Sequence, residues 1–500
     1  MIFPETLSKL LFIPFSNNLQ TGPVSVLFSR YLRPTFLKSG ILLGLLKDMN
    51  YLLAIDWSIT GIKAGQFILS FSILIVLHEL GHFLTAKWFG CRVDKFYLFF
   101  NPWFSLFKKK KGETEYGIGW IPLGGYVKIA GMIDESMDKE QMKQPAQPYE
   151  FRSKPAWQRL IIMLGGVTVN IILAILIFIV IAGVWGDKYI PISNLKYGVY
   201  ADSLGLKIGL KDGDRIIAVA GKPVQKVGTV GSEIIMNEAK SITVDRNGEK
   251  IELSIPAGFI GQLNKNRLGG FSYVRCPMII DSVVVKKAKI QKGNVQKGDT
   301  LIGFNGTAVY YNTDLNKLAD EYKDTIASFT LLRNGKDTVS AEVYFDNKGQ
   351  TYISFKSLED VLGTNHITYS LAESIPAGFN KCWFTLSKYI GNLRQLFTSK
   401  EIKTKDSLGS VISIGSIFPA VWDWQSFWAL TAIFSIILAF MNVLPVPGLD
   451  GGHALFTLVE MITGRKPSDK FMEYAQMVGM VLLLALMAYA LGLDIWRLFK

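Results

Sequence analysis

The sequence predicts a multi-pass α-helical membrane protein with two small β domains inserted between its second and third membrane helices. Two observations carry this prediction. Hydrophobic residues make up 49% of the 500-residue chain, and they gather in four long apolar runs. The stretch between the second and third runs has a mixed composition and contains an internal repeat.

Each of the four runs is long enough to form a helix that crosses a membrane. The runs lack Lys, Arg and Asp, and only the first contains a Glu. A helix that crosses the hydrocarbon core needs roughly 20 apolar residues. Four membrane helices are therefore expected, within Ala64–Ala86, Leu160–Gly186, Trp424–Leu449 and Tyr474–Leu493.

The net charge of +13 is best explained by the orientation of these helices in the membrane. Lys108–Lys111 follow the first run, and Arg152, Lys154 and Arg159 lead into the second. Positive residues are enriched in cytoplasmic loops, so this loop is expected in the cytoplasm and Asp187–Asp423 outside. No basic patch is interleaved with aromatic residues on a soluble fold, so nucleic-acid binding is not expected.

Six segments follow from this organisation. Residues 1–60 form an extension of unclear role, in which no apolar core with a cleavage site predicts a signal peptide. Translation from Met49 and an extension along the membrane surface both stay open. Ser374–Phe397 suits an amphipathic helix on the outer membrane surface, or a packed linker helix. The other segments are 61–186 (two membrane helices and their loop), 187–275 and 276–370 (two β domains), 371–423 (the amphipathic segment) and 424–500 (the last two membrane helices).

The internal repeat consists of "GLKDGDRIIAVAGKPV" from Gly209 and "VQKGDTLIGFNGTAV" from Val295. Both copies contain Gly-Asp, a short apolar strand and a further Gly at the same distance: Asp214 with Gly221, and Asp299 with Gly306. The pattern resembles PDZ domains of bacterial proteases, although the second copy is one residue longer upstream. A PDZ groove binds an extended peptide as an added strand. The alternative is that the two domains are spacers or steric filters with empty grooves.

The first apolar run contains His78-Glu79-Leu80-Gly81-His82, which is the pattern H-E-x-x-H. Two histidines four positions apart lie on one face of a helix and can meet one metal ion, while Glu79 is turned away by about 100° and can act as a base. Ionisable groups in a bilayer cost about 2.5–3.5 kcal/mol each and usually mark function. The alternative is that these residues only lie at the membrane–water boundary.

A catalytic zinc ion typically has three protein ligands and one open position, so a third ligand is needed. The third apolar run ends in "FMNVLPVPGLDGGHALF", where Asp450 is the only carboxylate. Pro445 and Pro447 break the helix just before it, and irregular backbone at membrane depth is tolerated where it lines a cavity. Two alternatives stay open: His453 as the ligand, and Asp450 as an ordinary helix N-cap.

The H-E-L-G-H motif in the first membrane helix and N-V-L-P-V-P-G-L-D-G-G in a later one resemble the site-2 protease family of intramembrane zinc metalloproteases, peptidase family M50. The four helices and tandem PDZ-like repeats resemble its bacterial regulator-of-sigma-E protease subgroup, from about Lys63 to the C-terminus. The resemblance favours Asp450 over His453. It implies one zinc ion, Glu79 as the base, and the ligands His78, His82 and Asp450.

Two further stretches resemble this family. "GIGWIPLGGYVKIAGM", Gly117–Met132, is similar to a membrane re-entrant β-hairpin near the active site, whose glycines allow an unwound substrate to approach as an edge strand. "FRSKPAWQRLIIMLGGVTVN", Phe151–Asn170, is similar to the entry to the second membrane helix. Asn170 and Asn442 are lone amides in apolar runs, and either bind substrate backbone or hydrogen-bond between helices. The candidate substrate-binding residues are Gly124, Gly125, Asn170, Asn442 and Pro445.

The resemblance implies an endopeptidase of the bacterial inner membrane that cuts within the transmembrane segments of single-pass proteins, in regulated intramembrane proteolysis. Its implied substrates are anti-sigma factors trimmed outside and remnant signal peptides. The active site is expected toward the cytoplasm and the PDZ domains in the periplasm. The alternative is a membrane-anchored PDZ scaffold with a vestigial metal site, against which the intact Glu79 argues. An intramembrane aspartyl protease needs two facing aspartates, and only Asp450 is suitably placed.

Overall fold

The computed structural model describes residues 57–132, 145–266, 269–284, 288–319, 322–347, 349–402, 407 and 409–498. The predicted extension at 1–60 therefore lies almost entirely outside the described residues. The chain divides into two compact units, Met1–Ile62 and Lys63–Lys500. Every site residue predicted from the sequence lies in the second unit.

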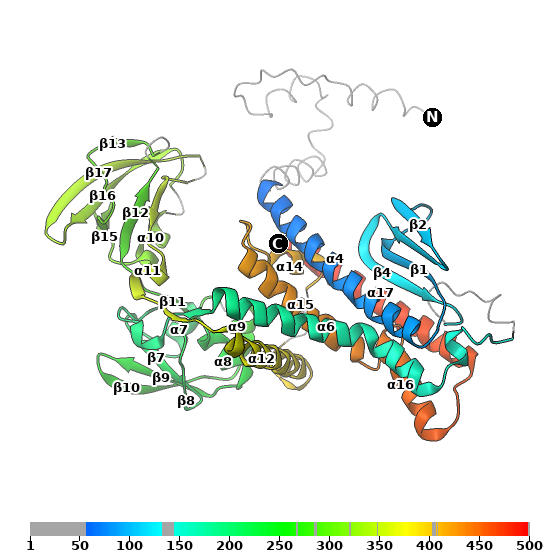
Figure 1. Cartoon of the computed structure of the whole chain (residues 1–500). Coiled ribbons are helices and arrows are strands. Elements are labelled where there is room, and N and C mark those ends of the chain that lie inside the picture. Colours follow the sequence, from blue (N-terminus) through cyan, green and yellow to red (C-terminus); the bar gives the residue numbers. More distant parts are fainter. Residues whose placement is uncertain are drawn as a thin grey trace, which may run out of the picture. The chain divides into compact units, whose positions relative to one another are not determined.

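Four helices of the described residues are long and apolar enough to cross a membrane, and they coincide with the four predicted runs (Figure 1). The third helix ends at Val443, before the predicted end of its run, because Pro445 has no N–H group to continue a helix. Asp450 then begins a separate helix, α16 (Asp450–Thr463). The four long helices are α4 (Trp57–Trp88), α6 (Ala156–Trp185), α15 (Trp424–Val443) and α17 (Asp469–Leu498).

Helices α4 and α6 approach closely where two glycines face each other. A Cβ atom added to Gly165 would lie 2.6 Å from the carbonyl oxygen of Gly81. Small residues at such a crossing let the helix backbones come together in a membrane. Between α15 and α6, the hydroxyl of Ser435 donates a hydrogen bond of 2.7 Å to the carbonyl oxygen of Asn170. The glycine contact holds the H-E-x-x-H half of α4 against α6, and the Ser435 hydrogen bond holds α15 against α6.

A four-stranded sheet follows α4, with the strand order β2-β3-β1-β4. Strand β3 is parallel to β1 and β4 is antiparallel to it on the other side. The predicted hairpin at Gly117–Met132 therefore differs in detail: its two strands flank β1 instead of pairing with each other. Entry of this sheet into the membrane stays a prediction. The strands are β1 (Val93–Phe100), β2 (Phe107–Lys111), β3 (Thr114–Ile118) and β4 (Ile121–Ile129).

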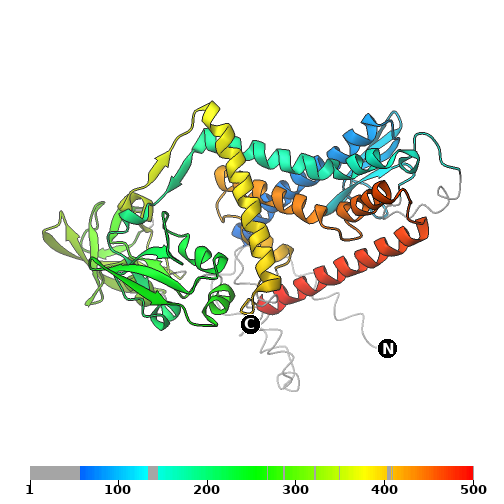
Figure 2. The ribbon, with the colours of Figure 1, turned by 90° about the horizontal axis from the view of Figure 1, so that it is seen from below.

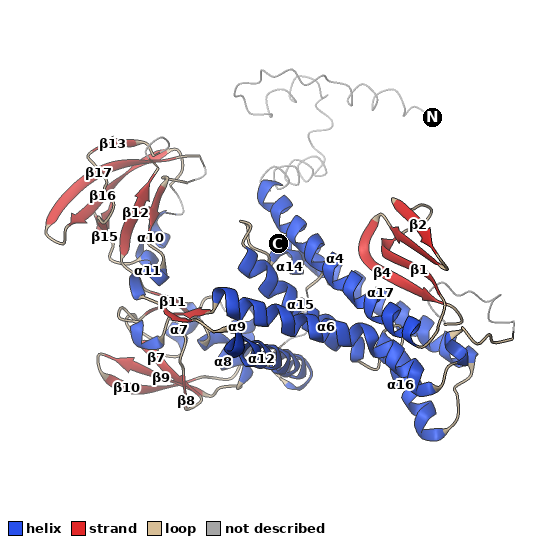
Figure 3. Cartoon of the chain, in the orientation of Figure 1, coloured by secondary structure: helices blue, strands red, loops and turns tan. Residues whose placement is uncertain are grey.

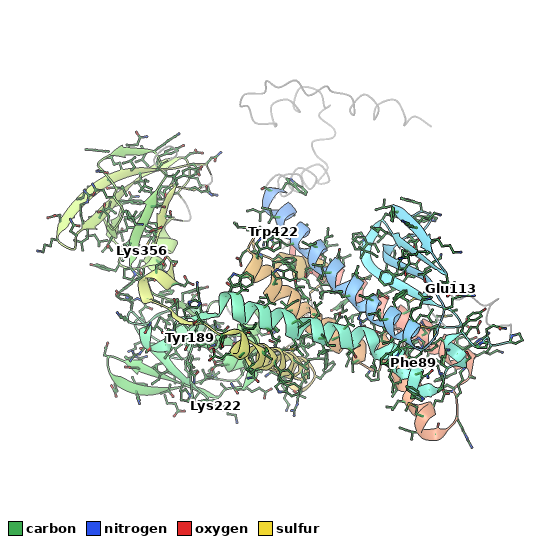
Figure 4. All side chains as sticks on the ribbon, in the orientation of Figure 1. Phe89, Glu113, Tyr189, Lys222, Lys356 and Trp422 are labelled. Carbon is green, nitrogen blue, oxygen red and sulfur yellow. The ribbon has the colours of Figure 1, made fainter. Side chains whose placement is uncertain are left out.

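The segment between α6 and α12 (Leu371–Thr398) leaves and rejoins the helices through one pair of strands, and its first β domain also contacts α12, where Nε2 of Gln395 donates a hydrogen bond of 2.7 Å to the carbonyl oxygen of Ile235. β5 (Asp187–Tyr189), whose last residue is labelled in Figure 4, leaves the end of α6. β19 (Asn365–Ile367) pairs with it in antiparallel fashion, with Tyr189 opposite Asn365. Helix α12 packs on α6 (Figure 2), where a Cβ atom on Gly378 would lie 2.5 Å from Ile179. Elsewhere it exposes aromatic side chains, which include Trp383 and Phe397. A packed helix is thus what the structure shows, and its placement on the membrane surface stays a prediction.

The inserted segment contains two β-rich regions, each with its own hydrophobic core (Figure 3). The first has the order β10-β9-β7-β8 beside the pair β11-β6, and the second has the order β13-β17-β16-β14-β12-β18 with β15 on β14. The strands of the first are β6 (Val199–Ala201), β7 (Arg215–Val219), β8 (Lys222–Pro223), β9 (Ser241–Arg246), β10 (Glu249–Ser254) and β11 (Ser272–Val274). Those of the second are β12 (Met278–Val283), β13 (Ile290–Lys292), β14 (Thr300–Phe304), β15 (Thr307–Ala308), β16 (Thr325–Arg333), β17 (Asp337–Phe345) and β18 (Ile353–Phe355). The remaining short helices are η1 (Phe151–Ser153), η2 (Ile192–Asn194), α7 (Ser203–Lys207), α8 (Val230–Met236), α9 (Phe259–Lys265), α10 (Asn312–Ala319), α11 (Leu358–Leu362) and α14 (Val411–Ser416).

The two Gly-Asp repeats form the same local structure. Arg246 donates hydrogen bonds of 2.7 Å from Nε and Nη2 to the two carboxylate oxygens of Asp214. Arg333 makes the same fork on Asp299, at 2.9 and 2.7 Å, and both aspartates are buried. The Gly that follows each strand is needed for its hairpin turn, because Gly306 and the residue before it both have positive φ, as Gly221 and its neighbour do.

Candidate metal centre

The two histidines of the H-E-x-x-H motif point the same way from α4. His78 and His82 are both buried, and their Nε2 atoms lie 3.3 Å apart. The i, i+4 spacing predicted this common face.

Asp450 brings a third ligand atom to the same place. Its Oδ2 lies 3.1 Å from Nε2 of His78 and 3.3 Å from Nε2 of His82. Tetrahedral zinc with bonds of about 2.0–2.1 Å needs ligand atoms roughly 3.3 Å apart, so these three atoms fit one ion. Oδ2 is also buried, and apart from these two imidazole nitrogens it has no hydrogen-bond partner among the described residues, so its lone pairs point toward the position of the ion. The N-cap of α16 is Leu449, so Asp450 is not the cap.

A cavity of about 350 Å³ opens onto this cluster. Glu79 and His453 line it together with the three candidate ligands, but neither belongs to the metal-capable group found among the described residues. Glu79 thus lines the same cavity as the candidate ligands, and its role as a base stays a prediction. The rest of the lining is Phe100, Gly125, Tyr126, Val127, Ile129, Met132, Met163, Gly448, Leu449 and Gln476.

Strand β4 forms one wall of the cavity, through residues that include Gly125 and Val127. It is the last strand in the sheet order, so one of its edges is not paired within the sheet. A Cβ atom added to Gly125 would lie 2.8 Å from Ile75 and 3.6 Å from Cγ of Glu79, whereas one on Gly124 would lie 2.7 Å from the ring of Phe100. Gly125 therefore allows β4 to lie directly against α4 at the H-E-x-x-H motif.

The family model for "Peptidase family M50" matches residues 66–486, which include both motifs and the inserted segment. The chain belongs to peptidase family M50. This confirms the family predicted from the two motifs.

The chain aligns with bacterial relatives over nearly their whole length. The chain is 24% identical to a "Putative zinc metalloprotease" of Treponema pallidum, over 85% of this chain and 97% of the relative. It is 25% identical to one of Thermotoga maritima, over 86% and 98%. A third, from Ralstonia nicotianae, is 27% identical over 87% and 98%. The names of these M50 relatives support a zinc metalloprotease, and the His78, His82 and Asp450 cluster is a site that can hold the metal.

Gly166 on α6 makes room for the two imidazoles of this M50 protein. A Cβ atom added to Gly166 would lie 2.5 Å from Nε2 of His82 and 2.6 Å from Cε1 of His78. Gly452 has a similar role in α16, where a Cβ atom would lie 2.6 Å from the carbonyl oxygen of Val446. The glycines beside Asp450 therefore let the first turn of α16 pack on the broken segment before it.

The remaining polar contacts divide into predicted and unpredicted ones. Both predicted amides touch His78: Nδ2 of Asn170 lies 3.1 Å from Nδ1, and Nδ2 of Asn442 lies 3.3 Å from Nε2. The partly buried ion pair of Arg159 with Glu460, which joins α6 to α16, was not predicted from the sequence. Gln476 in the cavity lining was not predicted either, although it is an amide inside the fourth apolar run, as Asn170 and Asn442 are in theirs.

Proposed function

We propose that this protein is an intramembrane zinc endopeptidase of the site-2 type, which hydrolyses peptide bonds within transmembrane segments of single-pass membrane proteins. One observation carries the proposal. His78, His82 and Asp450 converge in the interior of a bundle whose helices are long and apolar enough to cross a membrane. Charged groups at such depth are costly and typically functional.

The proposed chemistry assigns one task to each group around the cavity. When bound, zinc supplies Lewis acidity and an activated water nucleophile. His78, His82 and Asp450 hold the single ion. Glu79 takes the proton from the attacking water and passes it to the leaving amine, because it lines the cavity without belonging to the ligand group.

The substrate is proposed to add to the free edge of β4 as an extended strand. Main-chain hydrogen bonds to an unpaired sheet edge bind peptides without regard to their sequence. A helical segment has its backbone groups already paired, so it must unwind before it can bind there. Gly124, Gly125, Asn442 and Pro445 are the residues expected to contact it, and Asn442 is already within 3.3 Å of a ligand nitrogen.

The two inserted domains are proposed to be periplasmic PDZ domains that select substrates, and the protein to lie in a bacterial inner membrane with its active site toward the cytoplasm. The exposed lysines of β2 support this orientation, because cytoplasmic loops are enriched in positive charge. Anti-sigma factors trimmed outside and remnant signal peptides are the proposed substrates.

The proposal is tested with the full chain in vesicles and a single-pass substrate. Mass spectrometry of the products should place the cut inside the apolar segment, and a zinc chelator should stop the cutting. A cut outside the membrane segment would refute the intramembrane activity. Peptide binding by the inserted domains with no cutting of any membrane substrate would favour the rival scaffold function.

A further inference from the structure

The two imidazoles of the metal cluster are held differently on the side that faces away from the cluster. Nδ1 of His82 lies 2.8 Å from the carbonyl oxygen of Ile162. A carbonyl oxygen only accepts hydrogen bonds, so Nδ1 of His82 carries the proton and Nε2 presents its lone pair. The backbone of α6 therefore sets His82 in the tautomer that a metal needs.

His78 has a side-chain amide in the equivalent position. Nδ1 of His78 lies 3.1 Å from Nδ2 of Asn170, and Oδ1 of Asn170 is buried without a hydrogen-bond partner among the described residues. With the amide nitrogen donating, Nδ1 is the acceptor and the proton must be on Nε2, where it points toward Asp450 at 3.1 Å. That arrangement suits the cluster without a metal, and it leaves the amide oxygen unsatisfied.

Rotation of the Asn170 amide by 180° gives the buried amide oxygen a partner and also suits the tautomer of His78 that a metal needs. Oδ1 of Asn170 then accepts from the Nδ1–H of His78, and Nε2 is free to bind a metal. The oxygen and nitrogen of an amide have nearly the same shape, so the rotation needs no other movement.

We propose that Asn170 is a positioning residue whose amide oxygen accepts a hydrogen bond from Nδ1–H of His78 and thereby fixes this ligand for zinc. The inference rests on the proposed zinc site. Asn170 is fully buried, and its backbone carbonyl accepts a hydrogen bond from Ser435, so its helix position is held. The sequence left two roles open for this residue, and its contact with His78 is a hydrogen bond between helices α6 and α4.

Metal-binding histidines commonly donate the other ring N–H to such an acceptor, and loss of the acceptor costs roughly 10–100-fold in metal affinity. Asn170→Leu removes the acceptor at nearly constant size, whereas Asn170→Asp keeps one. Thr168→Val, at an exposed position of the same helix, is the control. The zinc dissociation constant of the full chain in detergent is measured by competition with a chelator. Asn170→Leu should weaken zinc binding about 10–100-fold, and Asn170→Asp and Thr168→Val should not.

A second measurement reads the tautomer directly. The chain has four histidines, so ¹⁵N-labelled histidine gives a spectrum simple enough to assign. With zinc bound, His78 should carry its proton on Nδ1 in every variant, because Nε2 binds the metal. This N–H should exchange slowly with water in wild type and Asn170→Asp and faster in Asn170→Leu, while the Nδ1–H of His82 stays unchanged because the carbonyl of Ile162 accepts it.

The outcomes separate this inference from the proposed function. Wild-type zinc affinity in Asn170→Leu would overturn the positioning role of Asn170 and leave the proposed function standing. Equal weakening of zinc binding by Asn170→Leu and Asn170→Asp would have the same meaning. Unchanged zinc affinity with a raised KM would show instead that Asn170 binds substrate. A wild-type chain that binds no zinc overturns both the metal site and the inference.

Discussion

Nε2 of His82 lies 3.3 Å from Oδ2 of Asp450, although one belongs to the first membrane helix and the other to a helix near the end of the chain. The two motifs recognised in the sequence are thus brought together by the fold. Neither motif forms a metal site alone, because the first supplies two ligands and the second supplies one.

Replacement of Asp450 by Ala should lower zinc affinity by more than the roughly 100-fold that loss of an outer-shell partner costs. His453→Ala removes a side chain that lines the same cavity but is not in the metal-capable group, so it should leave the zinc content unchanged. Metal analysis of the two purified variants checks this. The ligand assignment is wrong if His453→Ala loses the metal and Asp450→Ala keeps it.

Glu79→Gln should abolish cleavage and keep the zinc. The substitution removes the base and retains the shape of the side chain, and loss of general-base catalysis typically costs about 10²–10⁴-fold in rate. The measurement pairs a cleavage assay with metal analysis of the same sample. Equal loss of zinc and activity would show that Glu79 binds the metal or maintains the fold.

Gly166→Ala should disrupt the cluster without replacing any of the candidate ligands. The new Cβ atom would lie 2.5 Å from Nε2 of His82, so the imidazoles must move. Gly183→Ala on the same helix is a matched control, because its Cβ atom comes no nearer than 3.5 Å to Ser374. Zinc titration of both variants should show weakened binding for Gly166→Ala only. Equal binding in the two would contradict the close packing of α6 on the ligands.

Removal of the inserted domains tests whether they filter substrates by size. Residues 190–364 are replaced by Asn-Gly, which closes a two-residue hairpin between the paired residues Tyr189 and Asn365. The variant should bind zinc, cut a trimmed substrate at the normal rate, and also cut one with a bulky outer domain. Slower cutting of the trimmed substrate would instead indicate peptide binding in the grooves. Continued rejection of the bulky substrate by a zinc-loaded variant would refute the filter.

Acid should weaken the second inserted domain through Asp299. Hydrogen bonds from Arg333 hold the pKa of this carboxyl below its usual range. The pKa of Asp299 in the folded chain lies below the unfolded value of about 3.9, so its pair with Arg333 stabilises the fold fully above about pH 3.9. This stabilisation is lost as the pH falls through the folded pKa.

Hydrogen exchange of β14 and β16, corrected for intrinsic rates, measures this effect in the full chain. At pH 7 Asn in place of Asp299 should lower protection at least about tenfold, since hydrogen bonds to charged groups contribute roughly 1.5–3 kcal/mol. The variant should also lose less protection than wild type on acidification. Asp281→Asn, at an exposed ion pair with Lys297, is the control and should change little. An identical acid response in all three proteins would exclude Asp299 as the cause.

The sequence predicts those features that depend on local pattern. Four apolar runs suffice to locate the membrane helices, and Pro445 with Pro447 marks the break that starts α16 at Asp450. The i, i+4 spacing places His78 and His82 on one face. The Gly-Asp repeat indicates two similar domains, because its glycines are required by hairpin turns.

Features that depend on distant contacts were not predictable from one sequence. The carbonyl of Ile162 and the small size of Gly166 matter only because α6 crosses α4 at that point. The placement of β3 and β4 on opposite sides of β1 follows from pairing that alternation alone does not specify. One missed signal was available: Arg-Asn-Gly at Arg246 recurs at Arg333, and these arginines bind the repeat aspartates.

The pairing of β5 with β19 means that the chain leaves the helical bundle and returns to it at neighbouring points. Whatever is inserted there imposes no separation on the ends of α6 and α12. A domain exchanged at this junction therefore need not change how far apart these two helices lie. The inserted domains and the cluster of His78, His82 and Asp450 can accordingly diversify at different rates during evolution.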